Sequence, residues 1–198
     1  MGVAAHPHRE RQRVLLTGLL PDISTDPAIE TAIDSVEAGR SGTIVAPVGI
    51  RPPLLAAVAS RAATPLVVLT ATGRDAESLT NALASWIPGV AMLPAWETLP
   101  HERLSPQVDT MARRIAVLRR LVHPIEGDDS AGPMSVLVVP IRAFLQPIIS
   151  GLADLEPVRV RTGDILDLTD TTNRLAELGY ERVDMVEGRG QMSVRGGI

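Results

Sequence analysis

The chain has 198 residues, enough to bury the core of one large domain or of two small ones. Hydrophobic residues make up 45% of it and aromatic residues only 2%, so any core must be aliphatic and rich in alanine. The absence of cysteine excludes disulfides, thiol nucleophiles and cysteine-ligated metals. All 19 cationic residues are arginines, which excludes a phosphate-loop lysine and a lysine base. These exclusions favour an α/β protein without catalytic machinery of its own.

The charge and the N-terminal residues indicate a cytoplasmic protein. A formal net charge of −4 does not supply the basic field typical of nucleic-acid binding, although it leaves room for a local arginine patch. Residues 1–13 are basic but contain no apolar segment of a secretory signal. No apolar run reaches the roughly 20 residues needed to cross a bilayer. We expect residues 1–26 to form a flexible N-terminal arm.

Residues 27–150 are predicted to form an α/β domain, a parallel sheet with helices on both faces. Short apolar runs alternate here with helical periodicity, which is typical of strands that are buried on both sides. The expected elements are helices at 28–36, 54–61, 75–86 and 105–122 and strands at 43–46, 65–70, 90–93 and 135–139.

The helix at 105–122 carries the clearest signals. Ser105 can cap it, Pro106 suits its first position, and Asp109 lies in the first turn, where the helix dipole favours an acid. Its predicted apolar stripe comprises Val108, Met111, Ile115 and Leu118, and outside that stripe fall Arg113, Arg114, Arg119 and Arg120.

The pattern changes after about residue 150, where we place a domain boundary. Alternating apolar and charged residues predict strands at 156–161, 181–186 and 191–198, and a helix is predicted at 168–178. Alternation of this kind indicates an antiparallel sheet with one wet face. Residues 151–198 are therefore expected to form a small, incomplete α+β domain.

One segment stands where a phosphate-binding loop would lie, between the first predicted strand and its helix. Its residues are Val48, Gly49, Ile50 and Arg51. They provide a single glycine, no lysine and no hydroxyl group, and the following Pro52 and Pro53 lack N–H donors. We predict a degenerate, non-functional nucleotide loop and no ATP hydrolysis. The alternative is a nucleotide-binding α/β domain that acts on its own.

No other group of residues has the spacing of a catalytic or metal site. The four histidines are His6, His8, His101 and His123, and they do not form a ligand set. The Asp128-Asp129 pair lies in a polar loop and is predicted to be a solvated turn. No catalytic residue, metal or cofactor is expected.

Residues 93–106 form a crossover that contains three prolines and Trp96. Trp96 is predicted to be a packing anchor, buried between the sheet and the adjoining loops.

The order of several motifs is distinctive. Trp96-Glu97-Thr98-Leu99-Pro100 is followed by Ser105-Pro106, Asp109 and Arg114, then by an apolar strand at 136–140 and, near the end, by Gly179-Tyr180, Val183-Asp184 and residues 194–198. This order resembles the N-terminal region of the bacterial transcription-repair coupling factors, from about residue 43 to the last residue. The excision-repair protein UvrB is a more distant match.

The resemblance implies a module that binds the damage-recognition ATPase UvrA and has lost ATP hydrolysis. In that family the full protein is a longer DNA translocase that removes stalled RNA polymerase and recruits excision repair. Its motor and its contacts to RNA polymerase and DNA lie in other domains, so this chain is expected to be a non-catalytic interaction module. The resemblance also implies that the chain stops inside an inserted domain, as an engineered fragment would.

The resemblance places the UvrA-facing surface on residues 151–198. Arg195 matches a family arginine of that surface, Arg182 and Arg189 resemble UvrB arginines, and Gly196 follows Arg195. Arginine forks pair well with carboxylates at protein interfaces. Ser193 stands where UvrB has an arginine, which implies a thinner set of contacts. The alternatives are ordinary solvated arginines or a direct DNA-binding surface, against which the acidic pI of about 5.6 argues.

Overall fold

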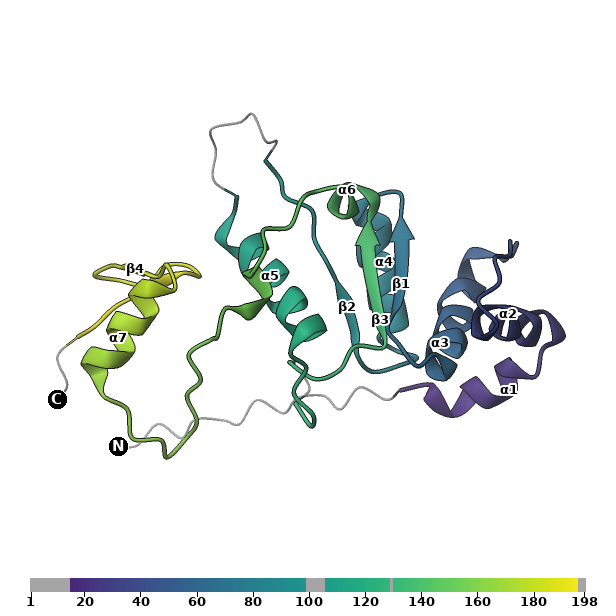
Figure 1. Cartoon of the computed structure of the whole chain (residues 1–198), viewed down its shortest axis with the longest axis horizontal. Helices are drawn as coiled ribbons and strands as arrows, with labels where there is room; N and C mark the ends of the chain where they lie inside the picture. Colours follow the sequence, from purple (N-terminus) through teal and green to yellow (C-terminus); the bar gives the residue numbers. More distant parts are fainter. Residues whose placement is uncertain (1–14, 99–105, 129, 196–198) are drawn as a thin grey trace, which may run out of the picture.

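This computed structural model describes residues 15–98, 106–128 and 130–195 (Figure 1). The helices are α1 (Leu20–Ser24), α2 (Pro27–Glu37), α3 (Arg51–Arg61), α4 (Gly73–Leu83), α5 (Val108–Val122), α6 (Ile141–Phe144) and α7 (Leu168–Glu177). The strands are β1 (Leu66–Thr70), β2 (Val90–Met92), β3 (Val136–Pro140), β4 (Glu181–Arg182) and β5 (Gln191–Met192). Helices α1, α2 and α3 lie at one end, the sheet of β1, β2 and β3 in the middle, and α7 with β4 and β5 at the other end.

β3 is the central strand, and all five of its residues are buried. It pairs in parallel with β1 on one side and β2 on the other. Because successive side chains of a strand point to opposite faces, β3 contributes to two cores. Val136 and Val138 belong to one core, and Leu137 and Val139 belong to the other. The predicted α/β fold with helices on both faces is confirmed.

The core on the α4 side of the sheet is aliphatic and rich in alanine, as predicted. Ala56 and Ala57 of α3 are fully buried, and their small side chains let neighbouring elements approach closely. Ile33 of α2 and Leu83 of α4 fill the space between the elements, with exposed fractions of 2% and 0%.

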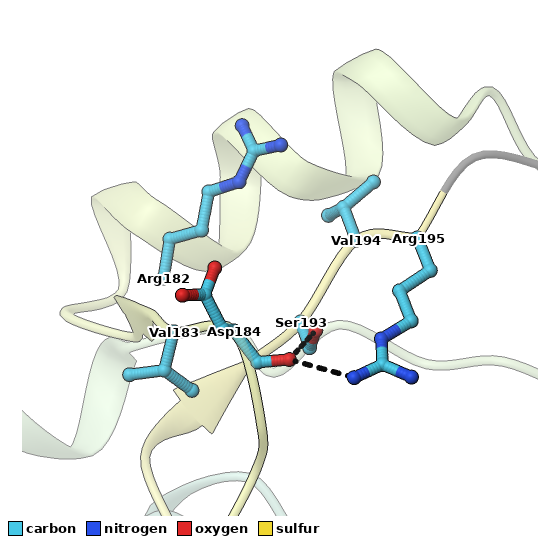
Figure 2. Close-up of a pocket in the computed structure, with 6 residues that line it drawn as sticks. All are labelled: Arg182, Val183, Asp184, Ser193, Val194 and Arg195. Carbon is cyan, nitrogen blue, oxygen red and sulfur yellow. Dashed lines mark hydrogen bonds between the residues drawn. The ribbon is translucent and has the colours of Figure 1, made fainter.

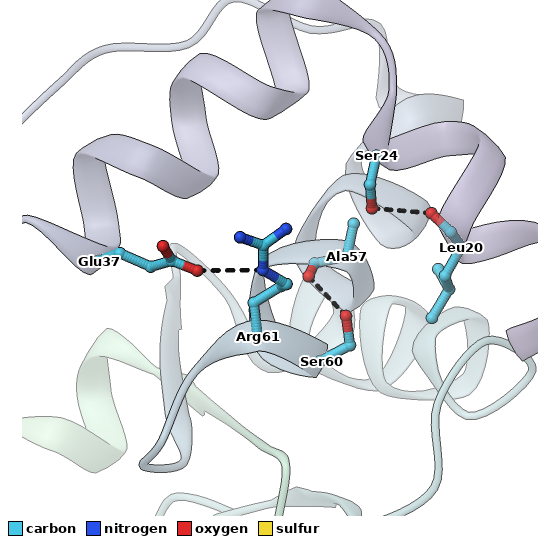
Figure 3. Close-up of polar contacts among 6 residues, drawn as sticks. All are labelled: Leu20, Ser24, Glu37, Ala57, Ser60 and Arg61. Carbon is cyan, nitrogen blue, oxygen red and sulfur yellow. Dashed lines mark hydrogen bonds and ion pairs between the residues drawn. The ribbon is translucent and has the colours of Figure 1, made fainter.

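Polar contacts lie within and between the N-terminal helices (Figure 3). Arg61 Nε, at the end of α3, lies 3.1 Å from Glu37 Oε1, at the end of α2. Within α1, Ser24 Oγ donates to the Leu20 carbonyl oxygen at 2.8 Å. An exposed ion pair contributes little to stability. The burial of Leu20, which is only 6% exposed, therefore holds α1 against the core.

Part of the segment 1–26, which was expected to form a flexible arm, is helical in the structure. Residues Thr17–Leu19 form a 3₁₀ turn that runs into α1, and Leu16 N donates to the Ser85 carbonyl oxygen at 2.8 Å. A five-residue helix has no stability alone and produces no readable periodicity, so only its packing against the core forms it. Residues 1–14 lie outside the described residues.

Two predicted strands, at 43–46 and 156–161, are absent from the described structure. Both segments are irregular, and Val45 is 97% exposed. An apolar or alternating run becomes a strand only when a neighbouring strand satisfies its N–H and C=O groups, and no described strand lies beside these segments.

The small sheet also differs from expectation. β4 and β5 have two residues each and pair in parallel, Glu181 with Gln191 and Arg182 with Met192, rather than in antiparallel fashion. The eight residues between the strands turn the chain back so that β5 runs in the same direction as β4. Residues 196–198 of the predicted last strand lie outside the described residues.

The start of α5 matches the prediction in part. Asp109 lies in the first turn as expected, but the helix begins at Val108 after Gln107, so Pro106 precedes it. The proposed cap, Ser105, lies outside the described residues.

One side of β1 lacks a covering layer among the described residues. Val67 and Leu69 pair with Leu137 and Val139 of β3, whose side chains lie in the core formed with α5 and α6. Val67 and Leu69 are nevertheless 51% and 46% exposed. The helices of this face therefore cover β3 but not β1.

Replacing Leu83 by alanine tests the first core. Leu83 is fully buried, so Leu83→Ala is expected to lower the free energy of unfolding by about 2–5 kcal/mol. Leu145→Ala is the matched control, because Leu145 is 75% exposed and its truncation should change the free energy by less than about 0.5 kcal/mol. Urea unfolding followed by circular dichroism measures both, and equal losses would contradict the assigned core.

Candidate partner-binding surface

The two short strands β4 and β5 border a depression of about 540 Å³. Six residues line it: Arg182, Val183, Asp184, Ser193, Val194 and Arg195 (Figure 2). Arg182 is the last residue of β4, and the other five residues directly follow β4 or β5. The parallel pairing of the two strands brings these segments side by side. Val183 N donates to the Met192 carbonyl oxygen at 2.9 Å and extends the pairing into the depression.

The Asp184 carbonyl oxygen joins the two sides of the depression. It accepts from Ser193 Oγ at 3.0 Å and from Arg195 Nη2 at 3.4 Å (Figure 2). Figure 2 shows the Arg182 guanidinium and the Asp184 carboxylate on one side of the strands and the Arg195 guanidinium on the other. Among the described residues, this long hydrogen bond is the one that the Arg195 guanidinium forms, and its remaining N–H groups have no described partner.

The Arg182 and Arg195 side chains are exposed and free to meet a carboxylate. Across residues 15–98, 106–128 and 130–195, neither guanidinium forms an ion pair. A guanidinium offers five donors in a planar fork that matches a carboxylate. The depression thus presents two arginines suited to acidic side chains.

Arg189 lies apart from these two arginines. It belongs to the loop before β5, and its Nε lies 3.0 Å from Asp109 Oδ1 at the start of α5. The structure therefore brings Arg182 and Arg195 to one depression and engages Arg189 elsewhere. Gly196, the fourth predicted contact, lies outside the described residues.

The segment predicted to be a degenerate nucleotide loop forms a 3₁₀ turn, Val48–Ile50, that continues into α3. Ile50 N donates to the Pro47 carbonyl oxygen at 3.0 Å, so this N–H is used inside the turn. Val48 is 73% exposed, and a Cβ added at Gly49 would meet nothing within 4 Å. Arg51 opens α3 as an exposed side chain. This turn is open, and one of its N–H groups is already used within it.

Trp96 is half-buried rather than fully buried, which corrects the prediction. The guanidinium of Arg114 lies over its ring, 4.4 Å from the ring centre, and Gln146 holds its backbone. Trp96 N donates to Gln146 Oε1 at 2.8 Å, and Gln146 Nε2 donates to the Trp96 carbonyl oxygen at 3.3 Å. Trp96 therefore anchors the crossover through a cation–π contact with Arg114 and two backbone hydrogen bonds with Gln146.

The buried face of α5 differs from the predicted stripe. It comprises Thr110, Arg114, Val117 and Leu118, whereas Val108 and Met111 are 43% and 39% exposed. Arg114 is only 1% exposed, because the neighbouring crossover offers it the Trp96 ring and the Pro94 carbonyl oxygen, to which Nη1 donates at 2.6 Å. Burial lowers the pKa of Arg114. Its helical spacing places it on the same face as Thr110, Val117 and Leu118, which is a signal for burial. Its charge favoured the opposite prediction.

Glu97 connects the crossover to the first turn of α5. Thr110 Oγ1 donates to Glu97 Oε1, and Arg142 Nη2 donates to the Glu97 carbonyl oxygen at 3.1 Å. Burial raises the pKa of Glu97, but hydrogen bonds, chiefly that from Thr110, outweigh burial and hold the pKa below its ordinary value. The crossover is thereby fixed to α5 and to α6.

Comparisons with known proteins show what this chain is similar to. A family model described as the UvrB interaction domain matches residues 158–198, the segment that contains the depression. The transcription-repair-coupling factor of Mycobacterium tuberculosis is 47% identical over 159 residues, which cover 79% of this chain and 12% of that protein. This chain is similar to the transcription-repair-coupling factors over most of its length.

Proteins of lower sequence identity include another coupling factor and a UvrB protein. The transcription-repair-coupling factor of Escherichia coli is 26% identical over 147 residues, 73% of this chain and 12% of that protein. The UvrABC system protein B of Idiomarina loihiensis is 26% identical over 187 residues, 86% of this chain and 27% of that protein. The resemblance inferred from the Trp96 motif is therefore confirmed. The chain spans only 12% of the length of the Mycobacterium tuberculosis coupling factor.

Two further structural facts concern metal ligands and membrane-spanning helices. Among the described residues, no three or more histidine, cysteine or acidic side chains gather as metal ligands. No helix in the described part of the chain is both long and apolar enough to span a membrane.

The sequence did not single out Val183, Asp184 and Val194 as parts of the site, although all three belong to its motifs. Asp184 takes part through its backbone carbonyl oxygen, which every residue possesses. No side-chain signal could have identified that role.

Truncating Arg114 tests its role in the crossover. Arg114→Ala removes a buried side chain, the cation–π contact and the bond to Pro94, so it should lower the free energy of unfolding by about 2–4 kcal/mol. Arg113→Ala, at the preceding position of α5 and with a side chain 58% exposed, should change it by less than about 1 kcal/mol. Unfolding in urea, followed by tryptophan fluorescence, measures both. A loss for Arg114→Ala no larger than for Arg113→Ala would refute the anchoring role.

Proposed function

We propose that this chain is a non-catalytic docking module of a transcription-coupled repair factor and that it binds the excision-repair protein UvrA. One observation carries the proposal. The segment that matches the UvrB interaction domain presents two exposed arginines, Arg182 and Arg195, around one depression. Neither is ion-paired within the described residues.

The geometry suits a partner that presents acidic side chains. Arg195 is oriented by the Asp184 carbonyl oxygen, so less side-chain freedom is lost when it binds. Arg182 and Arg195 both line the depression, with their guanidinium groups pointing away from each other (Figure 2), so a partner that spans the depression can offer a carboxylate to each. Because the chain as a whole has a net charge of −4, this attraction is local to the depression.

In the proposed role, the module brings UvrA to the place where RNA polymerase has stalled. Contacts to RNA polymerase and DNA, and the ATP-driven motor, are proposed to lie in other domains of the longer family protein. The module itself is proposed to work without a cofactor and in the cytoplasm.

The competing proposal, a nucleotide-binding α/β domain, has less support. The open Val48–Ile50 turn leads into a helix whose second and third residues are prolines, so two of the N–H groups that would hold a phosphate are missing. The chain also contains no lysine.

Truncation of the oriented arginine tests the partner assignment. Arg195→Ala should weaken UvrA binding by about 2 kcal/mol, roughly thirtyfold, because a central interface arginine loses its charged contacts. Arg174→Ala is the control, since Arg174 is exposed on α7 and paired with Glu177 at 3.1 Å in the same unit. Titration by calorimetry measures both affinities. Equal UvrA affinity for Arg195→Ala and the unaltered chain would reject the assignment.

Added nucleotide provides a second test. Millimolar ATP with Mg²⁺ is expected to leave the thermal unfolding midpoint unchanged, because a ligand stabilises only a fold that binds it. Scanning calorimetry with and without ATP measures this. A midpoint that rises with ATP concentration, and no longer rises in Arg51→Ala, would support the nucleotide-binding alternative.

A further inference from the structure

The loop before β5 is held against the first turn of α5. Asp109 lies between two arginines: its Oδ1 is 3.0 Å from Arg189 Nε, and its Oδ2 is 2.7 Å from Arg113 Nε. Arg113 belongs to the same helix as Asp109, whereas Arg189 comes from the unit that carries the depression. One carboxylate therefore joins the α/β domain to the proposed UvrA-facing unit.

The loop that presents Arg189 is internally ordered. Gln191 Oε1 accepts from Glu187 N at 2.8 Å and from Gly188 N at 3.0 Å, and Glu181 N donates to the Gly190 carbonyl oxygen at 2.8 Å. These bonds fix the loop to the β4–β5 pair, so Arg189 and the small sheet move together.

The backbone of this loop packs tightly on α5. Gly190 has a φ of 81°, and a Cβ added there would come within 2.7 Å of Val108 Cγ1. A side chain at position 190 would therefore be strained and would push the loop away from the helix. Glycine at this position permits the close approach that lets Arg189 reach Asp109.

We propose that Asp109 is an internal competitor for Arg189. It occupies the arginine with a carboxylate, the chemical group that an acidic partner surface would present, and the partner must displace it. This inference rests on the proposed function, because it concerns the regulation of the same UvrA-facing unit. When UvrA binds, Arg189 leaves Asp109 for a partner carboxylate, and Asp109 keeps its pair with Arg113.

The strength of the contact suits such an exchange. The Asp109 and Arg189 side chains are 38% and 67% exposed, and solvent-exposed ion pairs are weak. Arg113 already shares the carboxylate and neutralises it when Arg189 leaves. Asp109 therefore lowers the affinity for UvrA by a small factor and does not block binding.

The first measurement is UvrA affinity by calorimetric titration of the 198-residue chain. Asp109→Asn, which keeps the shape and removes the charge, should tighten binding about two- to fivefold. Arg189→Ala should weaken it, and the double variant should bind like Arg189→Ala alone. Asp75→Asn is the control, since Asp75 is also a first-turn aspartate, on α4, and it should change nothing. Unchanged or weaker binding of Asp109→Asn would overturn the inference.

The second measurement needs no partner. Phenylglyoxal modifies accessible guanidinium groups, and mass spectrometry gives the rate at each arginine. Arg189 should react faster in Asp109→Asn than in the unaltered chain, and faster in the unaltered chain at high salt than at low salt, while the Arg182 rate stays the same. Equal Arg189 rates in both proteins would overturn the internal pair even if UvrA binds. If no variant, nor the unaltered chain, binds UvrA while Arg189 reacts at the expected rates, the proposed function is rejected and the internal pair stands.

Discussion

The complete burial of β3 is the constraint on which the rest of the structure depends. A strand buried on both faces must have neighbours on both edges and a helical layer on both sides. β1 and β2 supply the edges, and the alternation of Val136, Leu137, Val138 and Val139 divides the interior into two cores. The long helix α5 packs on the face of Leu137 and Val139, and its first turn contacts the small C-terminal unit through Asp109 and Arg189.

α5 is the connector of the molecule, and arginines make its connections. Arg114 is buried under the Trp96 ring and holds the crossover, while Arg119 Nη1 donates to the Leu155 carbonyl oxygen at 3.0 Å and holds the segment that leads to α7. At the start of the helix, Asp109 holds Arg189. A planar guanidinium can stack on a ring and donate in several directions at once, which suits these mixed contacts.

The proposed partner surface depends on this connector. The depression at Arg182 and Arg195 lies in a sheet of only two-residue strands, and α7 has no buried residue. Such a unit has little core of its own. Its contacts with α5, through Arg189 and Gly190, therefore restrict how the arginines are presented to a partner.

The sequence by itself determined the α/β class, the positions of β1, β2 and β3, most of the helices and the family. These depend on local signals: apolar runs of strand length, helical periodicity and the Trp96-Glu97-Thr98 motif. It also identified Arg182 and Arg195, through resemblance to a known surface, although their use in binding stays a prediction.

Only the tertiary structure decided which runs became strands, which face of α5 is buried and what each arginine contacts. Residues 43–46 have the composition of a strand, but no strand of the described part of the chain pairs with them. Arg114 has the charge of a surface residue, yet it is buried because an aromatic ring and a carbonyl oxygen lie beside it. Arg189 was grouped with Arg195 by resemblance, but it meets Asp109, 80 residues earlier in the chain. Hydrogen-bond partners and ion pairs are set by distances in the folded chain, and a local sequence pattern carries no information about those distances.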